Sequence, residues 1–283
     1  MFLCGMRPDR FSAANAQGVR AVLTDFDGTL TTAGRLSPST YQALSDLQAA
    51  GLAVVLVTGR PAGWGEAFCR TFPVSAVITE NGGVTFWPGP GGRLERVYAV
   101  DEARLPVLRR RMHADAERVC KSVPGARLSS DSRYTEVDLA IDWNEEARLP
   151  VTAARQIEDA LRARGWDAVR SSVHVNFWPP GFDKRTACDA LLARLDLPSE
   201  AAVYVGDALN DAPLFGAYAR SIGVAGVLSL WDELPARPRF VTRADGGKGF
   251  EEVARAVVSA RAAAGRGRAA RSRAPRPRRA RAR

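Results

Sequence analysis

Residues 21–32 read "AVLTDFDGTLTT", a pattern from which the fold can be predicted. Its apolar start leads directly into two carboxylates, Asp25 and Asp27, separated by one phenylalanine. A continuous apolar run is typical of a strand buried on both faces of a parallel sheet. The two-residue period places both acids on one side of the strand end, where two charges about 4 Å apart repel by roughly 4 kcal/mol at an effective dielectric of 20. We therefore expect a core strand that ends at a bound cation or a shared proton.

Three further segments repeat this design, a short apolar run that ends in polar or glycine residues. They are residues 52–60 (LAVVLVTGR), 75–83 (SAVITENGG) and 201–211 (AAVYVGDALND). A helix is expected between the first two strands, with Ser37 as its N-cap and Gly51 at its end. This order predicts a parallel sheet covered by helices. Ligands bind beyond the carboxyl ends of such strands, so one set of side chains should meet there: Asp25, Asp27, Thr58, Asn81 and Asp207.

The middle of the chain follows a different pattern. Residues 135–143 and 173–178 alternate strictly between apolar and polar side chains, which predicts an antiparallel sheet with one wet face. Helices are expected within about residues 104–121 and 150–164. We interpret residues 84–179 as an inserted α+β module. Glycine and proline clusters mark its expected linkers, at residues 87–92 (WPGPGG) and 178–181 (WPPG).

The polar face of this module leaves two interpretations open. Glu136 and Asp138 share one face of the first strand, and His174, Asn176 and Trp178 share one face of the second. These side chains are either a solvated sheet face or a surface that contacts the hydroxyls and ring face of a sugar.

The formal net charge of +9 comes from one end of the chain. Residues 261–283 hold ten of the 40 basic residues and no acid, so residues 1–260 carry 30 basic and 31 acidic residues. A segment of Arg, Ala, Gly and Pro buries too little apolar surface to offset its ordering entropy. We expect a disordered tail, either a solvated extension or a polyanion-binding arm.

Cysteine usage and hydropathy point to the cytoplasm. The four cysteines are scattered singly, with no metal-binding spacing, which favours a reducing compartment. The apolar start, MFLCGM, is too short for a signal sequence, and no run reaches the roughly 18 to 20 apolar residues that span a bilayer.

The residues expected at the strand ends suit one kind of chemistry. Mg²⁺ takes one or two protein carboxylates and completes its shell with water and phosphate oxygens. The backbone amides of Gly28 and Thr29, the Thr58 hydroxyl and the Lys184 ammonium are suitable donors to phosphate. A carboxylate nucleophile, a metal and a phosphate cradle together predict phosphoryl transfer through an aspartyl-phosphate.

Four ordered motifs carry a resemblance to a known family. The segments DFDGT, VTGR (57–60), Lys184 in DKRTA, and VGDALNDAPLF (205–215) resemble those of the haloacid dehalogenase-like hydrolases. The insertion between the second and third motifs resembles the IIB branch, which includes sucrose-phosphate and trehalose-phosphate phosphatases and the Cof-like sugar phosphatases. The resemblance covers about residues 20–258.

The resemblance implies an organisation for the whole chain. A Rossmann-like parallel-sheet core would take residues 20–83 and 180–260, and an α+β cap that sets substrate specificity would take 84–179. An N-terminal extension would occupy residues 1–19, and the disordered tail residues 261–283.

The resemblance also implies roles for the motif residues. Asp25 would be the nucleophile, Asp27 the general acid and base, Thr58 a ligand of the transferring phosphoryl group, and Lys184 the residue that holds nucleophile and phosphate. Mg²⁺ would be held by Asp25, Asp207 and the backbone carbonyl of Asp27. Candidates for substrate or phosphate contact complete the set: Gly28, Thr29, Gly59, Arg60, Asn81, His174, Asn176, Asn210 and Asp211. Arg185 departs from the small residue that often follows the motif lysine, which bears on the start of its helix.

We therefore expect a Mg²⁺-dependent phosphatase that acts on a phosphorylated sugar or a similar small phosphomonoester. A phosphosugar mutase of the same superfamily is one alternative. A polyanion-binding protein that acts through its tail is another, from a different class. No membrane partner is expected.

Overall fold

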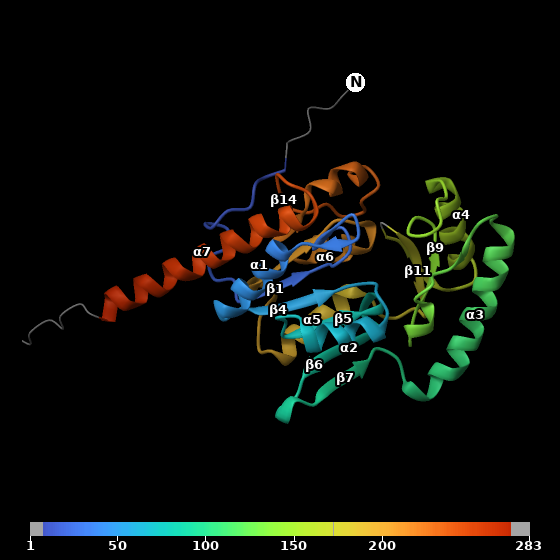
Figure 1. The fold of residues 1–283 in the computed structure, drawn as a ribbon, viewed down its shortest axis with the longest axis horizontal. Helices are drawn as coiled ribbons and strands as arrows, with labels where there is room; N and C mark the ends of the chain where they lie inside the picture. Colours follow the sequence, from blue (N-terminus) through green and yellow to red (C-terminus); the bar gives the residue numbers. More distant parts are fainter. Residues whose placement is uncertain (1–7, 172, 273–283) are drawn as a thin grey trace, which may run out of the picture.

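The computed structural model describes residues 8–171 and 173–272, which form a large core and a smaller cap (Figure 1). Residues 1–7 of the expected N-terminal extension and residues 273–283 of the expected tail lie outside this part. Residues 8–19 pack on the core, where Ala16 and Val19 are buried and the Phe11 ring lies 5.5 Å from that of Phe240. None of the helices in the described ranges combines the length and apolar character that crossing a bilayer requires.

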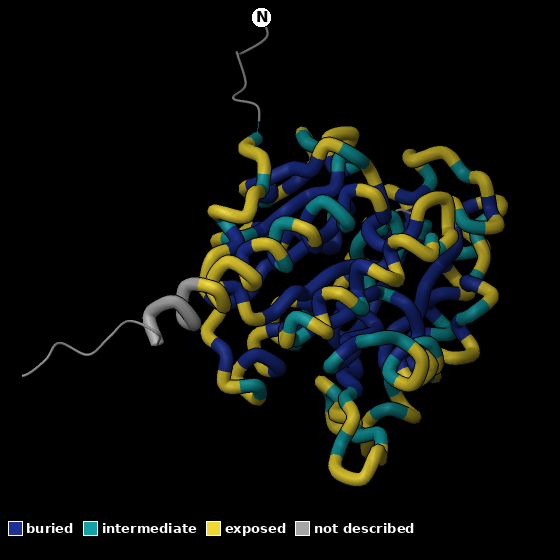
Figure 2. The backbone as a smooth tube through the Cα atoms, turned by 60° about the vertical axis from the view of Figure 1, so that its left-hand side comes forward, coloured by how far each residue is buried: buried dark blue, intermediate teal, exposed yellow. Residues whose placement is uncertain are grey.

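The core is built on one eight-stranded sheet. In spatial order its strands are β14 (Phe240–Val241), β13 (Ser221–Gly223), β12 (Ala202–Gly206), β1 (Ala21–Thr24), β4 (Ala53–Val57), β5 (Ala76–Thr79), β6 (Val84–Pro88) and β7 (Leu94–Tyr98). The first six run parallel, with Val22 of β1 facing Val203 on one side and Val54 on the other. These central strands are buried along their length (Figure 2), as expected for apolar runs without alternation.

Helices cover both faces of the sheet. One face packs on α1 (Pro38–Ala49), α2 (Ala62–Thr71) and α7 (Gly246–Ser272), and the other on α5 (Lys184–Arg194) and α6 (Ala212–Ala217). The expected N-cap is present, because the Ser37 side chain accepts a hydrogen bond from the Thr40 amide. A hairpin of β2 (Thr31–Thr32) and β3 (Arg35–Leu36) follows β1. Short 3-10 turns connect the elements: η1 (Glu80–Gly82), η2 (Pro90–Gly92), η3 (Glu102–Arg104), η4 (Ser132–Tyr134), η5 (Ser199–Ala201), η6 (Leu209–Asp211) and η7 (Ala225–Leu230).

The boundary expected at residue 84 is wrong. Strands β6 and β7 form an antiparallel hairpin that extends the core sheet beyond β5. The cluster WPGPGG forms the turn of this hairpin and is not a linker between domains. Val84 and Phe86 are buried against the core. The strand pair β6 and β7, which was expected to belong to the cap, therefore belongs to the core. The chain passes into the cap only after β7.

The cap is a four-stranded antiparallel sheet with two helices on one side. Its spatial order is β10 (Asp167–Arg170), β11 (His174–Trp178), β9 (Leu139–Asp142) and β8 (Arg127–Leu128). Helices α3 (Leu105–Ser122) and α4 (Val151–Arg162) match the expected ranges and lie on the side away from the core (Figure 1). Val175 and Phe177 face these helices, as the alternation predicts.

The opposite sheet face is not wet, contrary to the prediction. His174, Asn176 and Trp178 are all buried, because the core covers the face that alternation marks as polar. Sequence periodicity separates the two faces of a strand, but it does not show that a second domain covers one of them.

The expected disorder from residue 261 onward is wrong for its first part. Helix α7 continues to Ser272 and projects beyond the body of the core (Figure 1). Its packed section, which contains buried Phe250, Val253 and Val257, nucleates the helix. Alanine and arginine have high helix propensity, so extending a formed helix through them costs little.

Candidate active site

The functional side chains lie beyond the carboxyl ends of three parallel strands. Asp25 follows β1, Thr58 follows β4 and Asp207 follows β12. Because these strands are neighbours in the sheet, residues 182 positions apart in the chain meet at one edge. Asp25 and Thr58 are both buried. The predicted convergence is therefore present in the structure.

Lys184 holds the first carboxylate of the opening motif. It is the first residue of α5, whose N-cap Asp183 forms a capping box with Thr186. Its Nζ lies 2.7 Å from Asp25 Oδ1 and 2.7 Å from Asp211 Oδ1, and its side chain is 1% exposed. Burial alone would lower the Lys184 pKa, but the charges of Asp211 and Asp25 outweigh it and raise the pKa above its usual value. The ammonium stays charged, and Arg185 does not disturb the helix start.

Asp25, Asp207 and Asp211 form a cluster of carboxylates. One oxygen of each lies within 4.8 Å of the others. Burial raises the pKa of Asp25 to about 7, with Lys184 opposing the shift and Asp211 adding to it. The pKa of Asp207 is raised well above its usual value by burial and by the charges of Asp25 and Asp211. A divalent cation would relieve this repulsion, so the donor set fits a hard metal ion.

Asp207 and Asp211 differ in how many of their carboxylate oxygens are free to bind a metal. Both oxygens of Asp211 already accept hydrogen bonds, from Lys184 and Tyr204 at Oδ1 and from the Asp207 and Ala208 amides at Oδ2. Asp211 therefore shapes the loop. Asp207 accepts from the Thr29 hydroxyl at Oδ1, at 2.9 Å, and with Asp25 it offers the freer metal-binding oxygens.

The loop after β1 is tightly packed around these acids. Gly28 adopts a φ of +77°, and a Cβ there would lie 2.3 Å from an oxygen of Asp207, so only glycine fits. Its amide donates to the Thr31 hydroxyl at 3.0 Å, and it is therefore not the free phosphate donor that the sequence suggests. The Thr58 hydroxyl accepts from the Arg60 amide at 3.0 Å and keeps its own proton for donation.

Asp27 is held by a different cation from Asp25. Arg60 Nε lies 2.7 Å from Asp27 Oδ2, and Nη2 lies 2.9 Å from Oδ1. The same guanidinium reaches two cap residues, Asp131 at 3.2 Å and Glu145 at 2.8 Å. Arg60 is thus a bridge between core and cap, and its Nε, Nη1 and Nη2 all donate to carboxylates.

Amide and imidazole side chains join the cap to the core beside this bridge. Asn176 Nδ2 donates to the Gly59 carbonyl at 3.3 Å, and Asn81 connects Asp138 in the cap with Asn210 in the core. Three buried atoms have no hydrogen-bond partner in the described ranges: Asp138 Oδ1, His174 Nε2 and Asn210 Oδ1. Asn210 lines the same cavity as Asp25 and Asp27.

Glu80 is a site-forming residue that the sequence did not single out. Its fully buried carboxylate accepts four backbone hydrogen bonds, from Ala62 at the start of α2 and from Glu136, Val137 and Asp138 in the cap. Burial raises its pKa, and these four donors oppose the shift. Glu80 and Asn81 both adopt positive φ values, 52° and 54°. The sequence feature that could have identified Glu80 is its position directly after a buried strand.

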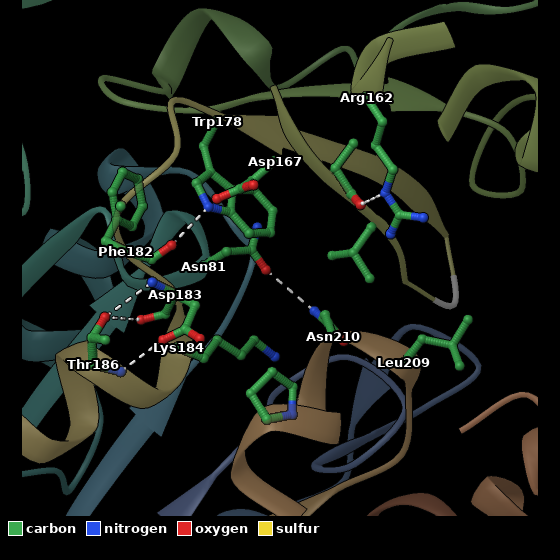
Figure 3. Close-up of a pocket in the computed structure, with 14 residues that line it drawn as sticks. Asn81, Arg162, Asp167, Trp178, Phe182, Asp183, Lys184, Thr186, Leu209 and Asn210 are labelled. Atoms are coloured by element: carbon green, nitrogen blue, oxygen red, sulfur yellow. Dashed lines mark hydrogen bonds between the residues drawn. The ribbon is translucent and has the colours of Figure 1, made fainter. Parts of the chain in front are cut away.

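Two cavities open at this junction. A small one of about 20 Å³ lies among Asp25, Asp27, Arg60 and His174. A larger one of about 440 Å³ lies on the other side of Asn210, which lines both. Figure 3 shows the larger cavity, with the Asn81–Asn210 hydrogen bond across its centre, the Lys184 ammonium below and Trp178 above.

The fold and the carboxylate cluster define the class of the protein. The chain belongs to the haloacid dehalogenase-like hydrolases and is an enzyme of their phosphatase group. The family profile, described as haloacid dehalogenase-like hydrolase, matches residues 22–92.

Relatives and solved structures agree with this placement. A phosphoglycolate phosphatase of Haloarcula marismortui is 31% identical over 82% of this chain and 94% of its own length. The sucrose-phosphatase of Synechocystis sp. PCC6803, solved with sucrose and phosphate, matches with a TM-score of 0.59 at 17% identity, over 84% of this chain and 96% of that one. A IIB sugar phosphatase of the family matches with a TM-score of 0.58 at 15% identity, over 84% and 97%. The resemblance to the IIB branch is therefore confirmed at the level of the fold.

Proposed function

We propose that the protein is a Mg²⁺-dependent phosphatase that hydrolyses a small phosphomonoester through an aspartyl-phosphate on Asp25. The observation that carries this proposal is the 2.7 Å contact between Lys184 Nζ and Asp25 Oδ1. Among the described residues this is the one hydrogen bond to the Asp25 carboxylate, so the other oxygen, Oδ2, is available to attack phosphorus. The surrounding acids make metal-free burial of this carboxylate costly.

The proposed reaction has two halves. The Asp25 carboxylate attacks phosphorus as the bond to the leaving oxygen breaks, and Asp27 gives that oxygen a proton. Asp27 then takes a proton from water, whose oxygen attacks phosphorus and releases Asp25 with inorganic phosphate. Asp27 must first leave Arg60, because both of its oxygens accept hydrogen bonds from the guanidinium here.

Asp25 and Asp207 would hold the metal ion, with the Asp27 carbonyl as the third protein oxygen. A bound Mg²⁺ supplies positive charge to the phosphoryl oxygens. Thr58 and Lys184 donate hydrogen bonds to the same group. Asp211 keeps Lys184 and the loop after β12 in position through its four hydrogen bonds.

We infer that the leaving group is a small acid, with 2-phosphoglycolate as the first substrate to test. The relatives named phosphoglycolate phosphatase support this choice. A sugar phosphate is the second candidate, favoured by the 440 Å³ cavity with Trp178 in its wall. We expect the activity to be cytoplasmic.

A substrate panel tests the proposal. Purified protein is given 2-phosphoglycolate, hexose phosphates and sucrose phosphate, with Mg²⁺ or with EDTA, and free phosphate is measured. We expect release only with Mg²⁺ and the highest kcat/KM for phosphoglycolate. A hexose phosphate that is isomerised without phosphate release would favour a mutase, and absence of turnover on the whole panel would reject a phosphatase.

A further inference from the structure

One guanidinium at the junction of core and cap faces three carboxylates. Arg60 contacts Asp27, Asp131 and Glu145 at distances of 2.7 to 3.2 Å, and its side chain is 8% exposed. One positive charge therefore faces three negative charges. Another anion can bind Arg60 only if one of these carboxylates leaves.

Glu145 is the carboxylate best able to leave. Its side chain is 34% exposed, against 19% for Asp27 and 13% for Asp131, so water can take over its solvation. Its backbone is fixed, because the Asp142 carboxylate accepts hydrogen bonds from the amides of Glu145, Glu146 and Ala147. Displacement therefore needs a side-chain rotation and no movement of the loop.

His174 supplies a second contact to the same carboxylate. Its Nε2 lies 2.8 Å from Glu145 Oε2, but the contact lacks hydrogen-bond geometry, and within the described ranges this atom has no other partner. The imidazole is 4% exposed. Arg60 and His174 thus face one carboxylate from two sides.

The position of this carboxylate matters because it lies beside the reaction centre. Arg60 and His174 line the 20 Å³ cavity that also contains Asp25 and Asp27. Glu145 contacts both Arg60 and His174, so its carboxylate occupies donors that face the reaction centre. Rotation of Glu145 frees donors of Arg60 and His174 beside this cavity.

We propose that Arg60 and His174 form the site for a carboxylate on the substrate's leaving group, and that Glu145 occupies this site until the substrate displaces it. Glu145 is then an internal competitor, and Arg60 and His174 are specificity-determining residues. This inference rests on the proposed function for its substrate class.

Binding measured without turnover tests the proposal. In the Asp25→Asn background, calorimetry compares 2-phosphoglycolate with 2-hydroxyethyl phosphate, which replaces the carboxylate by a hydroxymethyl group. Glu145→Gln should tighten phosphoglycolate binding by up to about 5-fold, because partly exposed ion pairs are weak, and leave 2-hydroxyethyl phosphate unchanged. Arg60→Met should weaken phosphoglycolate selectively by roughly 10- to 100-fold, the range of charge-assisted hydrogen bonds. His174→Gln should weaken it in the same selective way.

Glu146→Gln is the matched control, because Glu146 contacts Arg127 and Ser130 and not Arg60. It should change neither affinity. The proposal is overturned if Glu145→Gln alters both ligands equally or weakens phosphoglycolate binding. If the wild type hydrolyses 2-phosphoglycolate and 2-hydroxyethyl phosphate with equal kcat/KM, this inference is rejected but the proposed phosphatase activity stands. If the protein binds 2-phosphoglycolate selectively but hydrolyses no phosphomonoester, the proposed phosphatase activity is rejected and the carboxylate site at Arg60 and His174 stands.

Discussion

The two acids of the opening motif are held by two different cations. Lys184 holds Asp25 inside the core, where its other partner, Asp211, is also a core residue. Arg60 holds Asp27 across the boundary, with Asp131 and Glu145 contributed by the cap. Two carboxylates separated by a single residue thus belong to two networks of different kinds.

The difference between the networks is their freedom to rearrange. The Lys184 contacts are almost fully buried, and breaking one leaves an uncompensated charge in a medium of low dielectric. The Arg60 network includes Glu145, which is one-third exposed and can exchange its partner for water. The first network suits a fixed arrangement, and the second suits a contact whose partners can be exchanged.

The largest effect is expected at the Asp25 carboxylate. Asp25→Asn should reduce kcat on the order of 10⁴-fold or more, as loss of a nucleophile does in enzymes where the reacting groups act as a unit. Asp27→Asn should cost less, on the order of 10²- to 10⁴-fold, the range of general acid–base catalysis. Steady-state kinetics with Mg²⁺ measures both. Equal losses of kcat in Asp25→Asn and Asp27→Asn would contradict their different roles as nucleophile and general acid–base.

Removing the buried cation should damage the fold itself. Lys184→Met leaves Asp25 and Asp211 without their common partner, which should lower the free energy of unfolding by about 3 to 5 kcal/mol. Urea denaturation at pH 7 measures the change. The matched control is Lys248→Met, because Lys248 is exposed and should matter by less than about 0.5 kcal/mol. Similar losses in both variants would contradict a central role for Lys184.

Metal binding should stabilise the core network. At about 100 times its Kd, Mg²⁺ should raise the free energy of unfolding by about 2.7 kcal/mol, measured as a rise in Tm. Asp207→Asn should abolish the rise, and Asp232→Asn, at a fully exposed acid, should keep it. Because the pKa of Asp25 is raised to about 7, protons compete with the metal and the rise should shrink below that pH. A rise that survives in Asp207→Asn would place the metal elsewhere.

The smallest effect is expected at Glu145. His174 and Arg60 lower its pKa to about 2 although burial opposes the shift. A lowered carboxyl pKa adds stability that is complete above the unfolded value, about 4.5, and is lost as the pH falls toward 2. Wild type should exceed Glu145→Gln by less than about 1 kcal/mol at pH 6, and by less still at pH 3. A stability difference between wild type and Glu145→Gln that is larger at pH 3 than at pH 6 would contradict a stabilising ion pair at Glu145.

The core network could be predicted because it is local to strand ends. Asp25, Thr58 and Asp207 each follow an apolar run, and parallel strands bring such positions together by geometry alone. The contacts of Arg60 with the cap could not be predicted from strand-end positions. Asp131 and Glu145 lie in cap loops without a periodic pattern, and only the docking of cap on core brings them to Arg60. Glu80 was missed for the same reason, since its partners are backbone amides of distant segments.

Trapping the covalent intermediate identifies the nucleophile. Enzyme in turnover with Mg²⁺ is quenched in acid and reduced with borohydride, which converts an aspartyl-phosphate to homoserine, and the modified residue is located by mass spectrometry of peptides. We predict homoserine at position 25 and aspartate at position 27. Modification at position 27, or full turnover with no modified residue at all, would contradict the division of roles between the two acids.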